Sequence, residues 1–372
     1  MNQTKLPQDA AKVSVSGKEP EQQYLHGRGA QFNTRNRFLK DELTKEHIEG
    51  IDDWEENNNP TQYIEQQART IVNKVDSPDV GMAYSMNAYA GCEHGCIYCY
   101  ARNVHENWGY SAGLDFERKI IVKVNAPQLL RKQLMHKAWQ PLPIMLSGNT
   151  DCYQPAERKY RLTRGLLEVC NEFNQPVGIL TKNSAILHDK DLLQEMARKN
   201  IVTAMVSITS FNEELRRVME PRTATTAQRL RVIEALSQAG VKTGIMMGPM
   251  IPGLNEHEMQ RIMKAASDRG ATFTAYTFIR LNGAIKLLFH DWLYKNFPDR
   301  ADKIWHHIEQ SHGGKVNDSR WGLRMRGEGN IAEMVAQQYA KYGKLYHMNK
   351  DNRRPDNSRF RRPGIGTQGK LF

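Results

Sequence analysis

The sequence predicts an α/β protein in which helices cover a parallel β-sheet. From residue 82 onward, short apolar runs alternate with longer segments whose apolar residues recur at helical spacing. The short runs have the length of buried parallel strands, and repeated strand–helix units are typical of a parallel sheet. Six strands are expected, at residues 82–90, 144–148, 177–181, 202–208, 241–247 and 272–278.

Helices are expected between these strands because apolar side chains three or four residues apart share one helical face. Two such faces consist of Leu162, Leu166, Cys170 and Phe173, and of Leu230, Ile233 and Leu236. Cys170 is therefore expected to be a core residue. Asp189 suits a helix N-cap, and Asn255 with Glu258 suits a capping box.

Composition divides the 372 residues into four regions. Residues 1–60 are polar and are expected to be a loosely ordered extension, whose basic patches at 26–30 and 33–38 are by default solvated. Residues 61–280 carry the strand–helix pattern, and residues 281–348 read as helical, with a last helix near 331–346. Residues 349–372 form a polar, basic tail that is expected to be disordered.

The charge balance favours an anionic partner. The chain has 52 Lys and Arg against 41 Asp and Glu, a formal net charge of +11. Nucleic acid is the expected partner, although basic enzymes with small substrates are common. No apolar run approaches membrane-spanning length, and the N-terminus lacks the apolar core of a signal peptide, so we expect a soluble, cytoplasmic protein without a membrane partner.

Three of the five cysteines fall within eight residues, as Cys92, Cys96 and Cys99 in the spacing C-x3-C-x2-C. Three thiolates on a Gly-containing loop can hold three corners of a cubane iron–sulfur cluster, which normally takes four cysteine ligands. The missing fourth ligand leaves one iron with an open coordination position. Such an iron can bind a substrate or cofactor.

Two alternatives exist for this cysteine triplet. A structural zinc site would take His94 or His105 as its fourth ligand, but zinc ligands usually come as two separated pairs, and Cys152 and Cys170 are isolated. Disulfide bonding is disfavoured, because three clustered thiols without an export signal indicate a reducing compartment.

The cysteine triplet, with Tyr98 directly before Cys99, resembles the signature of the radical S-adenosylmethionine superfamily. The resemblance implies a TIM-type partial (β/α)6 barrel, with the cluster loop after its first strand. It also implies a [4Fe-4S] cluster whose open iron binds S-adenosylmethionine. An external one-electron reductant would then drive cleavage of that cofactor to a 5′-deoxyadenosyl radical, which abstracts hydrogen from a substrate.

Polar residues at the carboxyl ends of the expected strands should form the site, because ligands bind there in parallel α/β folds. The turn after the second strand has small and carboxamide residues that allow close backbone approach and offer acceptors to an ammonium group. Lys182, after the third strand, can pair with a carboxylate. The resemblance implies that the residues of this turn, Lys182 and two further residues bind S-adenosylmethionine. These residues are Ser147, Gly148, Asn149, Thr150, Asp151, Lys182, Ser207 and Glu220. An ordinary turn is the alternative for the segment 147–151, and helix capping is the alternative for Glu220.

Within the superfamily, residues 92–253 resemble the spore photoproduct lyase-like group, often labelled DNA repair photolyases. Tyr98 and Tyr100 match tyrosines implicated there in returning hydrogen to the radical. The hydrogen-donor cysteine of that lyase falls where this chain has Gly148 and Asn149. Cys152 is either a displaced donor or an inert buried cysteine, and we prefer the buried cysteine.

The function expected from this resemblance is radical chemistry on nucleic acid, with repair of a DNA lesion favoured. The alternatives are a small-molecule or protein substrate, and a non-catalytic iron–sulfur or zinc module that binds nucleic acid. Two further features point to partners. The segment 318–327 combines cations with an aromatic ring, which suits phosphate and base contacts, and Gln368–Phe372 resembles the Gln-x-x-Leu-Phe peptides that bind sliding clamps.

Overall fold

The computed structural model describes residues 24–39, 60–350 and 355–363. At its centre lies a seven-stranded sheet in the order β10-β9-β8-β7-β6-β3-β2. Every neighbouring pair from β3 to β10 is parallel, and only β2 runs antiparallel to β3. The strands are β2 (Val72–Lys74), β3 (Tyr84–Met86), β6 (Ile144–Leu146), β7 (Val177–Thr181), β8 (Val202–Ser207), β9 (Lys242–Met250) and β10 (Phe273–Phe278).

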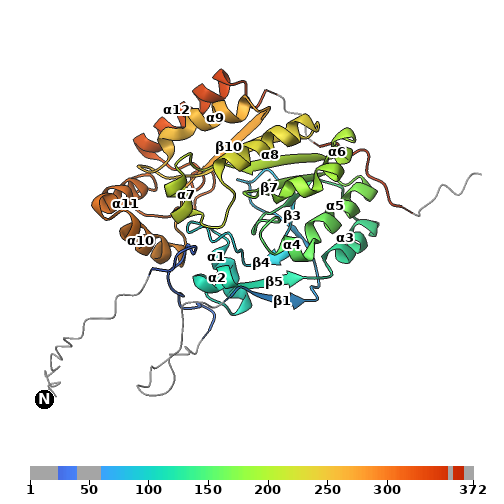
Figure 1. The fold of residues 1–372 in the computed structure, drawn as a ribbon, viewed down its shortest axis with the longest axis horizontal. Helices are drawn as coiled ribbons and strands as arrows, with labels where there is room; N and C mark the ends of the chain where they lie inside the picture. The colour runs from blue at the N-terminus through green and yellow to red at the C-terminus, as the bar shows by residue number, and fades with distance from the viewer. Residues whose placement is uncertain (1–23, 40–59, 351–354, 364–372) are drawn as a thin grey trace, which may run out of the picture.

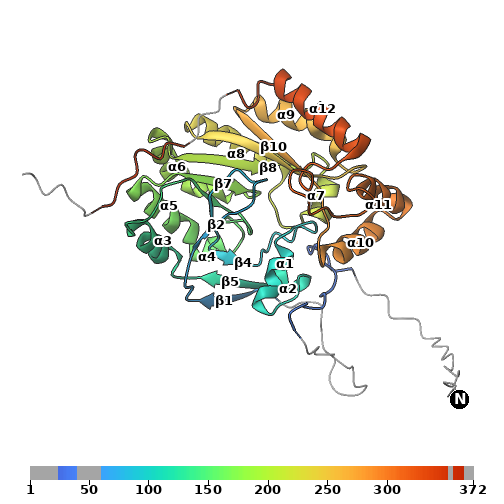
Figure 2. The ribbon, with the colours of Figure 1, turned by 180° about the vertical axis from the view of Figure 1, so that it is seen from behind.

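Helices connect these strands and lie along the outer side of the sheet (Figures 1 and 2). They bury their apolar faces in the single large core that the sheet also lines. The helices are α3 (Ala126–Met135), α4 (Glu157–Tyr160), α5 (Leu162–Phe173), α6 (Lys190–Arg198), α7 (Glu213–Met219), α8 (Thr226–Gln238) and α9 (Met259–Ser267). Six parallel strands joined by helical crossovers confirm the predicted partial (β/α)6 barrel.

A second sheet has the order β1-β5-β4, with β1 at Gln62–Gln66, β4 at Tyr89–Ala90 and β5 at Lys119–Lys123. It lies on the side of the molecule opposite α9 in Figure 1. The single strand predicted at residues 82–90 is therefore wrong. Its first half is β3 of the barrel, whereas its second half is β4, which pairs antiparallel with β5. The chain changes sheets because β5, a remote partner, supplies the hydrogen bonds of β4.

The remaining helices follow either the loop that carries the three cysteines or strand β10. Those after the loop are α1 (Arg102–His105), α2 (Leu114–Arg118) and the 3-10 turn η2 (Glu106–Trp108). Those after β10 are α10 (Ile285–Asn296), α11 (Ala301–Gln310) and α12 (Gly329–Leu345), and the other 3-10 turns are η3 (Ser184–Asp189), η4 (Glu256–Glu258) and η5 (Pro298–Arg300). Residues of α10 to α12 belong to the same core as the barrel.

The two predicted cap residues occupy N-cap positions, Asp189 at α6 and Asn255 at η4, but neither side chain makes a cap hydrogen bond. Asp189 makes no cap hydrogen bond and instead accepts from the Tyr153 hydroxyl. Asn255 and Glu258 do not form a capping box. Asn255 bonds backbone groups of the loop after β9, and Glu258 accepts from Ser210 at 2.6 Å. These side chains are used for tertiary contacts that helical spacing does not reveal.

Parts of both terminal regions pack on the barrel. In the N-terminal extension, Arg28 and Ala30 are buried and bond Glu117, which differs from the solvated tail expected for this patch. In the C-terminal tail, the Phe360 ring packs on Phe173 of α5. Gln368–Phe372 lies outside the described residues. Within the described ranges no helix combines the length and apolar character needed to cross a membrane.

Candidate active site

The loop that carries the three cysteines follows β4 and is held by hydrogen bonds along both of its sides. The Cys92 amide donates to Phe116 O at 2.8 Å, and the Ile97 amide donates to Met219 O at 3.1 Å. Gly95 has φ +66°, and an added Cβ there would lie 2.8 Å from the Glu117 carboxylate. Glycine is therefore required at this turn, both for its backbone conformation and for the close approach.

All three cysteines are free thiols. Cys92 and Cys96 are buried and Cys99 is half-buried. Burial raises the pKa of Cys92 well above its ordinary value and raises the pKa of Cys96 to about 12. Because burial opposes the thiolate, these sulfurs need a cation nearby to be charged, and iron supplies one. Three free sulfurs on one short loop thus fit the cluster predicted from the sequence.

A buried ion pair supports this loop from behind. Arg102 has no exposed surface and donates to the carbonyls of Gly95 and Cys96, both at 3.0 Å. The same guanidinium pairs with Glu117 at 2.6 Å. Glu117 also accepts from the backbone amide of Ala30 at 2.8 Å, so the N-terminal extension helps to position the cysteine loop.

The two histidines considered as zinc ligands are placed differently. His94 Nδ1 lies 3.4 Å from Asp151 Oδ2, and its Nε2 lies 3.2 Å from Asn183 Nδ2, so both ring nitrogens already have protein neighbours. His105 is buried against Phe116, and burial lowers its pKa to about 4. Among the described residues, no three His, Cys, Asp or Glu side chains are grouped as ligands of a single ion.

The turn after β6 approaches the cysteine loop through Asp151. Its carboxylate accepts from the Thr181 hydroxyl and from the Lys182 amide, each at 2.7 Å, and lies beside His94. Burial favours the neutral acid, but the charge of His94 and these hydrogen bonds lower the pKa of Asp151 to about 2. Asp151 therefore joins three segments of the site: the turn, the end of β7 and the cysteine loop.

Asn87 shapes the same turn, although periodicity gave no reason to select it. Its side-chain oxygen accepts from the amide of Asn149 at 2.9 Å and from that of Thr150 at 3.4 Å. Ser147 has φ +70° and accepts from the Cys152 amide at 2.8 Å. The turn is thus tightly bonded, and the cofactor contacts predicted for Ser147, Asn149 and Thr150 stay predictions.

Lys182, directly after β7, is half-buried beside the cysteine loop. Burial alone would lower its pKa, but the neighbouring Cys96, Glu220 and Asp151 outweigh that effect and raise it. Within residues 24–39, 60–350 and 355–363, no carboxylate lies within ion-pair distance of its ammonium group. A cation without an ion-pair partner among these residues suits a carboxylate ligand, and the cofactor contact predicted for Lys182 stays a prediction.

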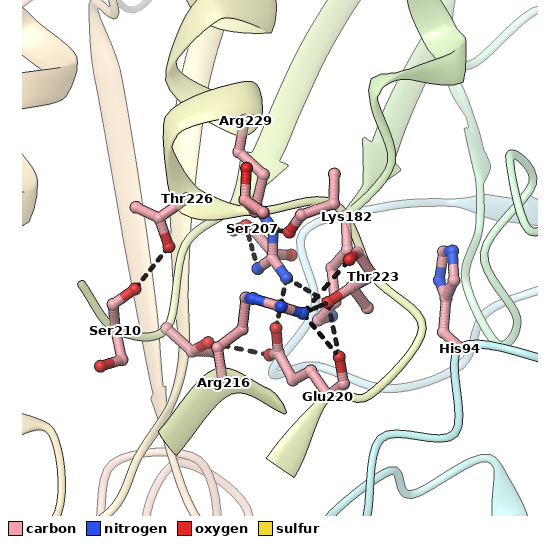
Figure 3. Close-up of polar contacts among 12 residues, drawn as sticks. His94, Lys182, Ser207, Ser210, Arg216, Glu220, Thr223, Thr226 and Arg229 are labelled. Atoms are coloured by element: carbon pink, nitrogen blue, oxygen red, sulfur yellow. Dashed lines mark hydrogen bonds and ion pairs between the residues drawn. The ribbon is translucent and has the colours of Figure 1, made fainter. Parts of the chain in front are cut away.

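Glu220, at the end of α7, is completely buried at the centre of a polar network (Figure 3). It pairs with Arg229 at 2.5 Å and accepts from the hydroxyls of Tyr98 and Thr209. Burial opposes its charge, but Arg229 and Lys182 lower the pKa of Glu220 to about 2. This geometry makes Glu220 an anchor for Tyr98, and the cofactor contact predicted for Glu220 stays a prediction.

The other predicted residues lie near this network or at the turn. Ser207 is buried, and its carbonyl accepts from Arg229 at 3.0 Å. Tyr100 is 46% exposed, and its hydroxyl donates to Gly148 O, so it joins the cysteine loop to the turn. Cys152 is buried in the hydrophobic core, and burial raises its pKa well above the ordinary value. That placement agrees with the inert cysteine preferred from the sequence, and a donor role stays a prediction.

Sequence reasoning missed Arg102, Arg229 and Asn87. Arg229 directly precedes the apolar face of α8 and is only 1% exposed. A charged residue beside an apolar face is usually solvated, so only the position of Glu220 reveals that Arg229 is buried and paired.

Comparison with known proteins agrees with this geometry. The family model described as the radical SAM superfamily matches residues 86–266. An uncharacterized protein of Mycobacterium tuberculosis is 32% identical over 244 residues, which cover 65% of this chain and 72% of the relative. A radical SAM Nalpha-GlyT isomerase of Pseudomonas phage M6 is 26% identical over 216 residues, covering 57% of this chain and 43% of the relative.

Among solved structures, spore photoproduct lyase complexed with a dinucleoside spore photoproduct is similar in fold. Its TM-score is 0.56 at 17% identity, with 76% of this chain and 79% of that chain covered. A lyase variant with bound AdoMet and the same photoproduct gives the same values. The fold, the cysteine loop and the family match together show that the chain belongs to the radical SAM superfamily and is a radical SAM enzyme, whose cofactors are a [4Fe-4S] cluster and S-adenosylmethionine.

Proposed function

We propose that this enzyme carries out hydrogen abstraction on nucleic acid, with a damaged or modified base of DNA as the substrate. The observation that carries the proposal is the convergence of three elements at one edge of the barrel: the cysteine loop, the Asp151 turn and Lys182. When bound, the cluster and S-adenosylmethionine supply a carbon-centred radical that removes a hydrogen atom from the substrate.

The residues of the chain have distinct parts in this proposal. Cys92, Cys96 and Cys99 hold the cluster and leave one iron for the cofactor. Lys182 binds the carboxylate of the methionyl group, because its ammonium group lies near the cysteine loop and is not neutralised by an ion pair with a described residue. Asp151 keeps the end of β7 beside the cysteine loop through the hydrogen bonds described above.

Two observations support nucleic acid as the substrate. The formal net charge of +11 favours a polyanion. The fold is similar to that of a lyase whose structure holds a dinucleoside photoproduct. Absence of salt-sensitive DNA binding would favour a small-molecule or protein substrate, because binding to phosphates falls steeply as salt increases.

The test is anaerobic reconstitution with iron and sulfide, followed by reduction in the presence of S-adenosylmethionine. We expect 5′-deoxyadenosine to form, and to form faster with ultraviolet-irradiated DNA than with untreated DNA. The Cys96→Ala variant, which lacks one of the three cysteine ligands of the cluster, is the control. Equal rates of 5′-deoxyadenosine formation with irradiated and untreated DNA would refute a DNA lesion as the substrate. No 5′-deoxyadenosine with either sample would refute radical chemistry.

A rearrangement is a second candidate reaction, favoured by one observation on Cys152. This thiol, next to the Asp151 turn, is buried in the core rather than exposed as a hydrogen donor. A rearrangement returns the abstracted hydrogen to the product and needs no separate donor, and one relative is named as an isomerase. Deuterium that returns from the cofactor to the product would support rearrangement, and uptake of solvent hydrogen would exclude it.

A further inference from the structure

Residues 316–326, here called the seam segment, connect the two edges of the open barrel. The barrel sheet ends in β10 on one side and in β2 on the other. At the β10 edge, the Phe278 amide donates to Met325 O at 2.8 Å. At the other edge, the Gly322 amide donates to Asp79 Oδ1 at 2.7 Å, in the connection between β2 and β3. The segment is thus held in a defined position across the opening.

Trp321 is the largest apolar side chain exposed in the seam segment. Its side chain is 57% exposed, although a tryptophan normally buries most of its surface. Arg324 lies over the indole ring at 3.7 Å from the centroid. The guanidinium is itself fixed by Asp79 at 2.5 Å and by the Ser77 hydroxyl at 2.7 Å. A ring held through one face, and largely open to solvent, is a platform on which a flat group can stack.

Arg280 follows the end of β10 and directly precedes Leu281, whose amide donates to Val316 O of the seam segment at 2.8 Å. Its electrostatic neighbours are Arg324, Tyr100 and Asp79, and burial together with the charge of Arg324 lowers its pKa. No described residue accepts a hydrogen bond or forms an ion pair with this half-buried guanidinium. An unpaired cation in such a place is costly, and an anionic ligand removes that cost.

Tyr100 links this pair of residues to the reaction site. It directly follows Cys99, is 46% exposed, and bonds the carbonyl of Gly148 in the turn after β6. A ligand that contacts Arg280 therefore lies next to the cysteine loop. An aromatic platform that contacts Arg324, and an unpaired guanidinium with both Arg324 and Tyr100 as neighbours, match the base and the phosphate of one nucleotide.

We propose that Trp321 and Arg280 form a nucleotide subsite, in which Trp321 stacks an unpaired base and Arg280 binds the backbone phosphate next to the nucleotide that reacts. The inference rests on the proposed function and specifies its substrate as a DNA strand with an unstacked nucleotide. A paired base is excluded from the platform because its faces are covered by its neighbours in the duplex.

The test measures binding of the reconstituted enzyme to a single-stranded DNA oligonucleotide and to the matching duplex over a range of salt concentrations. Trp321→Ala should weaken binding to the single strand at least fivefold, and Trp321→Phe should restore most of it, since alanine substitution of a stacking ring has effects of this size. Arg280→Met should lower the slope of log affinity against log salt by about 0.7, the value for one phosphate contact on a single strand.

Arg198→Met is the matched control. Arg198 is exposed at the end of α6, which leads into the amino-terminal end of β8, the edge of the sheet opposite the site. Its removal should leave the affinity unchanged, and iron content and unfolding midpoint verify that each variant is folded.

The outcomes separate this inference from the proposed function. Wild-type enzyme that shows no salt-sensitive DNA binding overturns the proposed function and the subsite with it. Wild-type enzyme that binds DNA, with Trp321→Ala binding as tightly, overturns the subsite alone. A preference for the duplex over the single strand also overturns it, because a paired base cannot reach the platform.

Discussion

Replacing Glu220 by glutamine should strongly destabilise the fold, because it leaves the guanidinium of Arg229 buried without its counter-charge. The two side chains are 0% and 1% exposed and lie 2.5 Å apart. Breaking a buried pair by removing one partner costs about 3–5 kcal/mol. The lowering of the pKa of Glu220 from 4.5 to about 2 corresponds to roughly 3 kcal/mol, which agrees with that range.

Equilibrium urea unfolding under anaerobic conditions measures this effect. With a slope of about 3 kcal/mol per molar urea, the midpoint of Glu220→Gln should fall by about 1 M. The double variant Glu220→Gln with Arg229→Met should be less destabilised than the sum of the two single variants, because it leaves no charge unpaired. In the wild type, the stabilisation should be present above about pH 4.5 and be lost as the pH falls toward 2, because the folded state lowers this pKa.

The exposed pair of Lys264 and Asp268 provides the control. Their nitrogen and oxygen lie 2.7 Å apart, but the side chains are 60% and 53% exposed. Asp268→Asn should therefore change the free energy of unfolding by less than about 1 kcal/mol. The reasoning is refuted if Glu220→Gln unfolds at the wild-type midpoint, or if the two single effects simply add in the double variant.

Three further predictions concern the cluster, a buried acid and the cofactor. The Cys96→Ala variant should bind much less iron after reconstitution than the wild type. The Cys170→Ala variant, in which a core cysteine is replaced, should retain its iron. Equal iron contents in the two variants would contradict the ligand assignment. Burial raises the pKa of Glu157 from 4.5 to about 7, so the folded wild type should lose up to roughly 3 kcal/mol as the pH rises from about 4.5 through 7. Glu157→Gln should lack this loss when urea unfolding is compared at about pH 5 and about pH 8, and an unchanged pH dependence would assign the loss to another group. Lys182→Met should weaken binding of S-adenosylmethionine about tenfold, as expected for loss of a charged hydrogen bond. Lys190→Met, which changes an exposed lysine, should leave the affinity unchanged. Equal affinities of the two variants by calorimetry would remove Lys182 from the cofactor site.

Local patterns in the sequence determined the main features of the barrel. The strands predicted at 177–181, 202–208, 241–247 and 272–278 are β7 to β10, with ends shifted by at most three residues. These strands are largely buried, with helices on the outer side of the sheet, so they appear as short apolar runs that adjacent residues alone define. The cysteine triplet is equally local, because three ligands on one loop need no distant partner. Family and cofactors therefore followed from eight residues and their spacing.

Tertiary structure decided which polar residues are anchors and which sheet each segment joins. The run at 82–90 looks continuous, but its second half pairs with β5, about thirty residues further along the chain. Glu220 resembled a cofactor ligand in the sequence, and only the tertiary structure reveals that it is buried against Arg229. Trp321 and Arg280 are 41 positions apart, and both have Arg324 of the seam segment as a neighbour. Burial and charge pairing depend on contacts between remote segments, so no local spacing could have predicted them.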